Sequence, residues 1–332
     1  MTKQLIEPLP ADFRQIVAKV AGKKIPGEFS VVSLFSGCGG LDMGFLGGFK
    51  FLGKVYDRLP YRIVWANDIK PSACQTYEAN LKHKINCADI WDALSTLPKT
   101  ADVVIGGFPC QDVSINGSLL GAEGARTNLY KAMVEVVRRT QPRVFVAENV
   151  KGLLMPKNKD FYEEIMAAFR GLGYSVQADV YLAADYGVPQ MRERVFIVGT
   201  RGRTKKFQPP MPARTPAAWI TAKEALDDLA EVPENAAINH IWSRAAKSGE
   251  QGERYIKADK PADTMRAECH GNIQFHYKLR RRLSMREAAR IQSFPDHFIF
   301  SGGLRETERQ IGNAVPPVLA WHIAKAVRDC LV

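Results

Sequence analysis

The sequence predicts an α/β protein with a doubly wound, mostly parallel sheet and a second, smaller domain. From about residue 30 to 200, short apolar runs alternate with segments of helical periodicity, which is typical of a sheet covered by helices on both faces. After Gly199 this alternation stops until about residue 283, and the chain becomes basic and rich in proline. A change of this kind indicates a domain boundary.

Six apolar runs are the predicted strands, because each is short, rich in β-branched residues and bounded by residues that favour turns. They span residues 31–35, 62–66, 102–106, 143–147, 176–183 and 195–199. Helices are predicted over 127–140 and 160–171, where apolar residues recur at helical spacing on one face. Two more helices are expected to begin at the capping boxes Thr221 with Glu224 and Ser284 with Glu287.

These patterns divide the chain into four parts. We expect an N-terminal extension at 1–30, a main domain at 31–200 plus 306–332, a small domain at 201–282 and a hinge at 283–305. The chain has a net charge of +11, and the small domain holds 16 Lys and Arg against 10 Asp and Glu. This excess of positive charge favours a polyanionic partner such as nucleic acid, with a solvated surface as the alternative.

Composition excludes several other classes. The first thirty residues lack the apolar core of a signal peptide, and no stretch approaches the roughly 20 apolar residues of a membrane span. The six cysteines form no CxxC pair and have no regularly spaced His partners, so neither disulfides nor a metal site are expected. We therefore expect a soluble, intracellular protein.

Cys110 is a candidate nucleophile. It lies in GGFPCQDVSING at 106–117, directly after an apolar strand that should end at the carboxyl edge of the sheet, where such folds bind ligands. Pro109 stiffens the backbone before the thiol, and the polar residues Gln111, Ser114 and Asn116 follow it. The alternative is a buried, inert thiol.

A second group of residues is typical of a nucleotide-like cofactor site. Gly37, Gly39 and Gly40 follow the first strand, where glycines let the backbone approach a ligand closely, although the GxGxxG spacing is not met. Asp68 follows the second strand, so its carboxylate can accept hydrogen bonds from ribose hydroxyls. Asp89, in CADIW at 87–91, lies at the probable end of a further strand before 102–106. The alternatives are a plain turn and two helix caps.

Charged side chains are predicted at the same edge of the sheet. Glu148 ends the strand that should neighbour the one leading to Cys110, so a carboxylate and a thiol would face one pocket. Arg192 and Arg194 lie two residues apart at a strand start and should point to the same face, which suits recognition of phosphate or carbonyl groups. Asn313 precedes a helix opened by prolines. Glu148 could instead be a capping or ion-paired residue.

Taken together, these strings resemble the cytosine-C5 DNA methyltransferase family from about residue 31 to 328, in family order. The matching strings are SLFSGCGGLDMGF (33–45), GGFPCQDVSING (106–117), AENVKG (147–152), QMRERVFIVG (190–199), RRLSMREAARIQSFPD (281–296) and QIGNAVPPVLA (310–320). The resemblance implies a Rossmann-like catalytic domain that binds S-adenosylmethionine, with 201–282 as the target recognition domain. Within the family, the chain most resembles the bacterial restriction-modification type. In that type a cognate restriction endonuclease acts separately.

The resemblance also implies catalytic roles. Cys110 would attack C6 of cytosine, Glu148 would hold or donate the proton at N3, and Arg194 would bind O2. Arg192 would meet a nearby backbone phosphate. Because C5 and C6 are inaccessible in a stacked duplex, the base must flip out, and the glycine-rich segment 117–128 would close over it.

The cofactor assignments follow from the same motifs. The implied S-adenosylmethionine pocket comprises Phe35, Gly37, Gly39, Asp68, Ile69, Asp89, Ile90, Pro109, Leu129, Asn313 and Val315. Asp68 stands where the family often has Glu, which keeps the carboxylate. Asn116 stands where the family often has Ser, at a loop position whose side chain would help to fill the space left by the target base.

The DNA-contacting residues are carried over more loosely. Besides Gln111, Ser114 and Asn116, they are Thr264, which resembles the family's recognition-domain threonine, and Arg266, His270 and Asn272, whose donors reach base edges. His276 follows them and is also expected to reach base edges, while KLRRRL at 278–283 would grip phosphates.

Two other functions stay open at this point. The chain could methylate RNA, as the tRNA-methylating branch of the family does, or it could be a non-catalytic DNA-binding regulator on the same fold. The regulator would be expected to lack Cys110, Glu148 or a glycine of the first turn, and all are present. We expect a monomer acting on double-stranded DNA, without a metal, in the bacterial cytoplasm and associated with the nucleoid.

Overall fold

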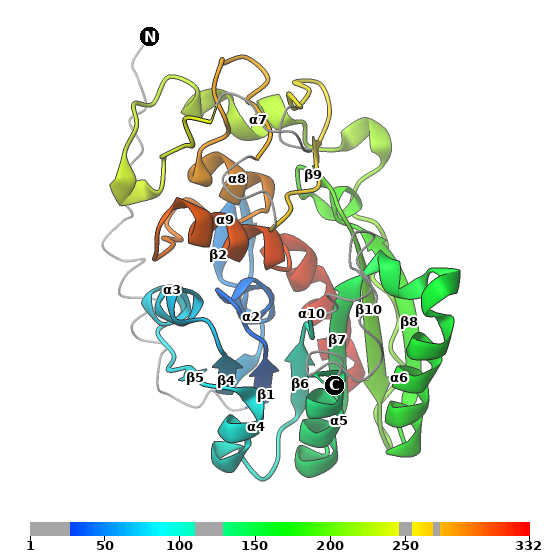
Figure 1. Cartoon of the computed structure of the whole chain (residues 1–332). Helices are drawn as coiled ribbons and strands as arrows, with labels where there is room; N and C mark the ends of the chain where they lie inside the picture. The colour runs from blue at the N-terminus through cyan, green and yellow to red at the C-terminus, as the bar shows by residue number, and fades with distance from the viewer. Residues whose placement is uncertain (1–26, 110–128, 246–253, 268–272) are drawn as a thin grey trace.

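The computed structural model describes residues 27–109, 129–245, 254–267 and 273–332 (Figure 1). Its centre is a seven-stranded sheet in the order β5-β4-β1-β6-β7-β10-β8. The strands are β1 (Phe29–Leu34), β4 (Tyr61–Asp68), β5 (Asn86–Cys87), β6 (Val103–Gly106), β7 (Val144–Val150), β8 (Ser175–Leu182) and β10 (Glu193–Thr200). β10 runs antiparallel to both β7 and β8, while the other pairs are parallel. The predicted doubly wound, mostly parallel sheet is confirmed.

The central strands β1, β6 and β7 are mostly apolar because both faces of the sheet are covered. Successive side chains of a strand point to opposite faces, so Val31 lies in one hydrophobic cluster and Val32 in the other. The first cluster takes in apolar side chains of α2 (Gly40–Leu46), α3 (Pro71–Leu81) and α10 (Pro317–Leu331). The second takes in those of α4 (Ile90–Ala93), α5 (Leu129–Thr140) and α6 (Lys159–Gly171).

The predicted helices agree with the structure over the described residues. The segment 160–171 forms α6, and 129–140 forms α5 with Met133, Val136 and Val137 fully buried on the face that the spacing indicated. Residues 127 and 128 lie outside the described residues.

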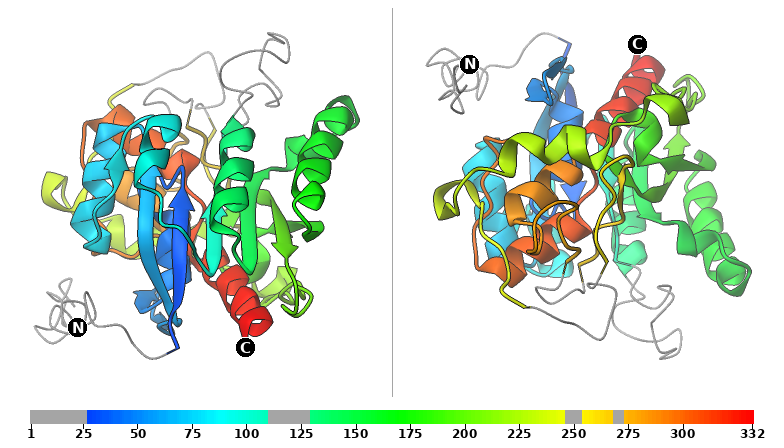
Figure 2. Two further views of the ribbon diagram at one scale, coloured as in Figure 1. Left: turned by 90° about the horizontal axis from the view of Figure 1, so that it is seen from below. Right: turned by 90° about the horizontal axis from the view of Figure 1, so that it is seen from above.

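The remaining elements lie mostly on the side of the sheet that α2 and α10 cover, and most of their buried apolar residues belong to the first cluster (Figure 1; Figure 2, right). They are β9 (Gln190–Met191), β11 (Ala262–Asp263), α7 (Ala222–Leu226), α8 (Met285–Ile291) and α9 (Leu304–Asn313), with a separate hairpin of β2 (Phe49–Phe51) and β3 (Lys54–Tyr56). Short 3₁₀ helices occur at 94–96, 151–154, 156–158, 183–186, 216–218, 227–229 and 236–238.

Both predicted capping boxes are confirmed at the starts of α7 and α8. The hydroxyl of Thr221 accepts from the backbone N–H of Glu224, whose carboxylate accepts from the N–H of Thr221. Ser284 and Glu287 make the same reciprocal pair. Each pair satisfies N–H groups that a helix start leaves without intrahelical partners. The proposed domain boundaries themselves stay a prediction.

Candidate active site

The candidate site lies along the edge where β1, β4, β6 and β7 end. Parallel strands bring their carboxyl ends to one edge, and this edge carries the turn after Leu34, the side chain of Asp68, the segment Gly107–Pro109 and Glu148. Residues that are distant in the sequence are thereby placed around one region of the molecule.

The glycine turn after β1 is bound to the end of β4. Phe35, Gly37 and Gly39 all have positive φ values, of 52°, 55° and 94°. Glycine adopts such values at little cost, and it occupies two of these three positions. The N–H of Gly37 donates to Oδ2 of Asp68 at 2.8 Å, and the N–H of Lys70 donates to Oδ1 at 2.8 Å. Asp68 therefore fixes the turn, and its burial raises the pKa of its carboxyl group.

The turn also packs closely against the start of α10. A Cβ atom on Gly40 would lie only 2.4 Å from the carbonyl oxygen of Val315, whereas one on Gly37 would meet no atom within 4 Å. Gly40 is thus required by packing, and Gly37 borders open space. The structure brings the predicted cofactor residues Gly37, Asp68 and Val315 together at this turn.

The other predicted cofactor residues differ in their surroundings. Ile69 is 56% exposed, while Ile90 is buried in the hydrophobic cluster under α4. Asp89 is exposed and accepts from the N–H of Trp91 as the N-cap of α4, which is the helix-cap alternative considered from the sequence. In this structure Ile90 is part of the hydrophobic core. Phe35 and Leu129 are half-buried, and Pro109 and Asn313 are exposed.

Glu148 and Arg194 form a buried ion pair where β7 reaches this edge. Nε of Arg194 lies 2.9 Å from Oε1 of Glu148, and the two side chains are only 12% and 11% exposed. Antiparallel pairing of β7 with β10 sets their spacing, since Glu148 is opposite Phe196. Burial raises the pKa of the Glu148 carboxyl group, while Arg194 and Arg192 oppose that rise. Such a group can exchange a proton nearer neutral pH than an exposed glutamate.

The segment that leads to Cys110 crosses directly over Glu148. A Cβ atom on Gly107 would lie 2.8 Å from Oε2 of Glu148, and Nδ2 of Asn149 donates to the carbonyl of Phe108 at 3.2 Å. A side chain at 107 would displace the Glu148 carboxylate. The chain is thereby held against the carboxylate three residues before Cys110, and Cys110 itself lies outside the described residues.

Arg192 has a different role from the one predicted. It is 1% exposed, and its guanidinium donates to the backbone carbonyls of Met265 at 2.9 Å, Gly312 at 2.7 Å and Ala314 at 3.2 Å. The prediction that Arg192 meets a DNA phosphate is wrong for this structure, because its donors face the protein interior. The alternation of side chains predicted that Arg192 shares a face with Arg194. It could not predict which residues would cover Arg192.

The predicted DNA-contacting residues fall into two groups. Thr264 donates its hydroxyl to the carbonyl of Met191 at 2.6 Å, and Arg266 is exposed nearby. The others lie outside the described residues, so their roles stay predictions: Gln111, Ser114, Asn116, His270 and Asn272.

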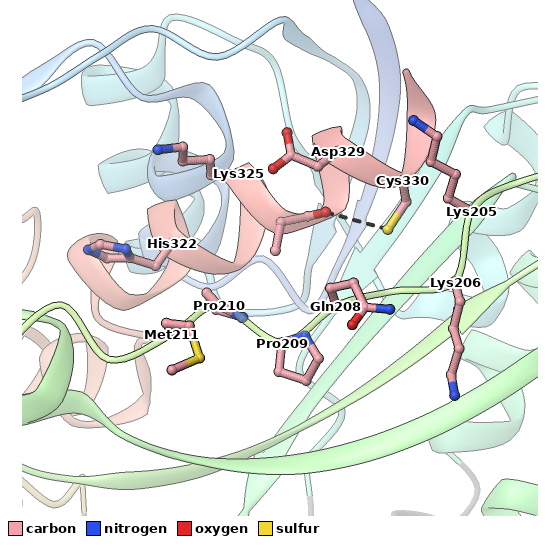
Figure 3. A pocket seen from close by; sticks show the side chains of 11 residues that line it. Lys205, Lys206, Gln208, Pro209, Pro210, Met211, His322, Lys325, Asp329 and Cys330 are labelled. Carbon is pink, nitrogen blue, oxygen red and sulfur yellow. Dashed lines mark hydrogen bonds between the residues drawn. The ribbon is translucent and has the colours of Figure 1, made fainter.

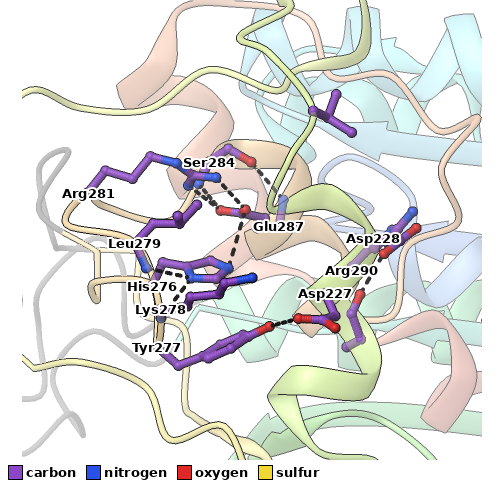
Figure 4. Close-up of polar contacts among 12 residues, drawn as sticks. Asp227, Asp228, His276, Tyr277, Lys278, Leu279, Arg281, Ser284, Glu287 and Arg290 are labelled. Atoms are coloured by element: carbon purple, nitrogen blue, oxygen red, sulfur yellow. Dashed lines mark hydrogen bonds and ion pairs between the residues drawn. The ribbon is translucent and has the colours of Figure 1, made fainter.

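Part of the basic stretch before α8 is structural (Figure 4). His276 is fully buried, and its Nδ1 accepts from the N–H groups of Lys278 and Leu279. Arg281 makes a bidentate pair with Glu287 at 2.7 and 2.8 Å. Arg282 is 1% exposed and stacks on Phe275, which leaves Lys278 and Arg280 exposed. The expectation that His276 reaches base edges is therefore wrong, as is the expectation that the whole stretch grips phosphates.

Two buried glutamines complete the site and were missed from the sequence. Nε2 of Gln190 donates to Oε1 of Gln292, and Nε2 of Gln292 donates to the carbonyl of Ala314. Both residues are fully buried. The sequence did contain a clue to Gln190. It lies two residues before Arg192 and four before Arg194, a spacing that would place all three side chains on one face of an extended segment.

A separate basic groove of about 560 Å³ lies between the segment after β10 and α10 (Figure 3). It is lined by Lys205, Lys206 and Lys325, with His322 at one end. Burial, together with Lys54 and Lys325, lowers the pKa of His322 to about 4. Because β10 runs from Arg194 to the groove, the extended strand separates the two regions by about 20 Å. The groove is therefore distinct from the candidate active site.

Comparisons with known proteins agree with this geometry. The family model described as C-5 cytosine-specific DNA methylase matches residues 29–255 and 234–329. The chain is 36% identical to the Type II methyltransferase M.NgoFVII of Neisseria gonorrhoeae, over 90% of this chain and 86% of that protein. It is also 36% identical to the Type II methyltransferase M.FnuDI of Fusobacterium nucleatum, over 91% and 94%.

Solved structures share the fold. A prophage-encoded DNA modification methyltransferase from E. coli superposes with a TM-score of 0.71 at 21% identity, covering 92% of this chain and 99% of that one. The S. pombe Dnmt2 methyltransferase superposes with a TM-score of 0.64 at 17% identity, covering 91% and 99%. Because the family model matches most of its length and relatives are 36% identical over most of both chains, the chain belongs to the C-5 cytosine-specific DNA methylases.

Proposed function

We propose that this protein transfers a methyl group from S-adenosylmethionine to C5 of a flipped-out cytosine in a specific duplex DNA sequence, through a covalent bond from Cys110 to C6. The observation that carries the proposal is the buried Glu148–Arg194 pair, against which the chain leading to Cys110 is packed. A carboxyl group and a guanidinium side by side match the N3 and O2 edge of cytosine.

The roles of the side chains follow from the electronics of cytosine. C5 is a poor nucleophile until a group adds at C6. The Cys110 thiolate forms a bond to C6 while Glu148 holds a proton at N3, so negative charge from the ring is neutralised there. Arg194 stabilises the charge at O2. After C5 gains the methyl group, loss of the C5 proton and of the thiolate restores the aromatic ring and the free enzyme.

The residues at the glycine turn fit S-adenosylmethionine, which supplies an electrophilic methyl group when bound. Asp68 presents a carboxylate to a ribose diol, and the open space beside Gly37 leaves room for a ligand close to the backbone. Ile69, more than half exposed next to Asp68, can cover an adenine face. Asn313 and Val315 lie at the neighbouring turn before α10.

The substrate is assigned as duplex DNA on charge and on the relatives. Lys278 and Arg280 remain exposed near the start of α8, in the region predicted to recognise the target. The curated relatives are named Type II methyltransferases, which supports a place in a restriction-modification system with a separately acting endonuclease. We expect a cytoplasmic monomer; among the residues that the structure describes, no helix is both long and apolar enough to cross a membrane.

A direct test compares substrates. Purified protein is incubated with S-adenosylmethionine carrying a labelled methyl group and with either mixed-sequence duplex DNA or tRNA. We expect label in duplex DNA and at least 100-fold less in tRNA. Preferential labelling of tRNA would favour the RNA alternative, and duplex binding without label would favour the non-catalytic regulator.

A further inference from the structure

Arg192 lies where three segments that are distant in the sequence meet. Its guanidinium binds the carbonyl of Met265 in the predicted recognition region and the carbonyls of Gly312 and Ala314, which flank Asn313. Two residues further along the chain, Arg194 pairs with Glu148. One buried side chain thus contacts the recognition region and the turn before α10, and it lies between β9 and β10, the strand that carries Arg194.

The recognition segment 262–267 is fixed against β9, the short strand that ends one residue before Arg192. β11 pairs in parallel with β9, with Ala262 opposite Gln190 and Asp263 opposite Met191. Beyond that ladder, the N–H of Met265 donates to Oε1 of Gln190 at 2.9 Å. The segment therefore follows β9 up to the residue whose carbonyl Arg192 binds, so the two cannot shift independently.

The far side of the segment packs on the end of α9. A Cβ atom on Gly312 would lie 2.5 Å from the backbone nitrogen of Ala267, so the two backbones are in direct contact. Gln292 connects the carbonyl of Ala314 to Gln190. The junction is buried: Gln190, Arg192 and Gln292 are at most 1% exposed.

We infer that Arg192 is a positioning residue that couples the recognition segment 262–267 to the Glu148–Arg194 pair. The inference rests on the proposed methyl transfer to DNA. A guanidinium is planar and rigid, so a change in the position of the Met265 carbonyl is passed to β9 and to Arg194, about 7 Å further along the extended chain. When segment 262–267 binds the correct DNA sequence, Arg192 therefore favours the position of Arg194 that suits the cytosine. A wrong sequence would disturb that position and slow the reaction, which adds to sequence discrimination.

The test measures discrimination rather than activity alone. Arg192→Lys and Arg192→Met are assayed for kcat/KM on a duplex with the wild-type target site and on one with a single base pair changed. We expect the ratio of the two values to fall at least tenfold in Arg192→Met and less in Arg192→Lys, which keeps one donor. A purely structural role would reduce the folded fraction and lower both rates equally, so the ratio would not change.

Arg286 provides a matched control, because it is 1% exposed and also donates to three backbone carbonyls, those of Ile238, Pro295 and Phe298. Arg286→Lys should lower the Tm and leave the discrimination ratio within threefold of wild type. Gly312→Ala, which disturbs the junction from its other side, should lower the ratio as Arg192→Met does.

Two results would overturn the coupling: a ratio within threefold of wild type in both Arg192 variants, or an equal loss in Arg286→Lys. If wild-type protein transfers no methyl group to duplex DNA, the proposed function fails instead, so the two failures are distinguishable.

Discussion

At the scale of single residues, two carboxyl groups are held in buried surroundings. Glu148 is buried beside Arg194, and Asp42 on α2 is completely buried. Ionised carboxylates are costly to bury, so each is retained by specific partners, and each gives a different observable.

Glu148→Gln should abolish most of the activity. Glutamine keeps the size of the side chain but cannot carry a labile carboxyl proton, and general acid–base groups contribute about 10²- to 10⁴-fold. We expect kcat to fall at least about 100-fold, while affinity for duplex DNA changes much less. Glu193→Gln is the control, because Glu193 is an exposed neighbour in β10 paired with Lys151. A Glu148→Gln enzyme within about fivefold of wild type would contradict the role.

Asp42 makes stability depend on pH. Burial raises the pKa of Asp42 from 3.8 to about 6, although Ser33 and Tyr77 oppose the rise. A raised pKa means that the folded state binds the proton more tightly, so this contribution to stability is present below about pH 4 and is lost as the pH rises through about 6.

Asp42→Asn should remove that loss. Relative to wild type, the free energy of unfolding of the variant should increase by about 2–3 kcal/mol between pH 4 and pH 8, measured by urea denaturation. Asp160→Asn, at an exposed position of α6, controls for the removal of one negative charge. A constant difference between Asp42→Asn and wild type across this range would contradict the assignment.

At the scale of elements, α2 and α10 pack so closely that glycine is required between them. A Cβ atom on Gly44 would lie 2.2 Å from Cβ of Ala320. Gly44→Ala should therefore destabilise the protein by about 1–3 kcal/mol, against the usual gain for alanine in a helix. Gly171→Ala in α6 meets no atom within 4 Å and should be neutral or stabilising by up to about 1 kcal/mol. Equal effects of the two substitutions in urea denaturation would refute this packing argument.

The sequence predicted these elements well where local patterns decide them. Continuous apolar runs identified the central strands because both faces are buried, and capping boxes identified the starts of α7 and α8. Contacts between distant segments could not be predicted in this way. Arg192 and His276 have polar side chains of the kind that bind DNA. Only the fold shows that these side chains form hydrogen bonds with backbone groups instead.

At the scale of the whole molecule, positive charge is spread over both edges of the sheet. Only the edge near the candidate site should contact a short duplex. Replacing Lys278 and Arg280 with Gln should weaken binding uniformly across sequences. The slope of log K against log salt should fall by about 1 for each phosphate that the variant no longer neutralises. Lys205, Lys206 and Lys325 line the groove on the far side, so their triple replacement with Gln should leave that slope unchanged.

Titration of short duplexes between about 50 and 200 mM salt checks this assignment. The opposite result would contradict this assignment. If the salt slope falls in the Lys205, Lys206 and Lys325 variant and is unchanged in the Lys278 and Arg280 variant, the DNA binds at the groove and not near the candidate site.

The central claim is that Cys110 attacks a cytosine that the Glu148–Arg194 pair holds. Bisulfite sequencing of duplex DNA treated with S-adenosylmethionine and either wild-type protein or Cys110→Ser tests it most directly. The account predicts protected cytosines at one position of a defined sequence with wild-type protein, and none with Cys110→Ser. Undiminished protection by Cys110→Ser, or no protected cytosine with wild-type protein, would contradict it.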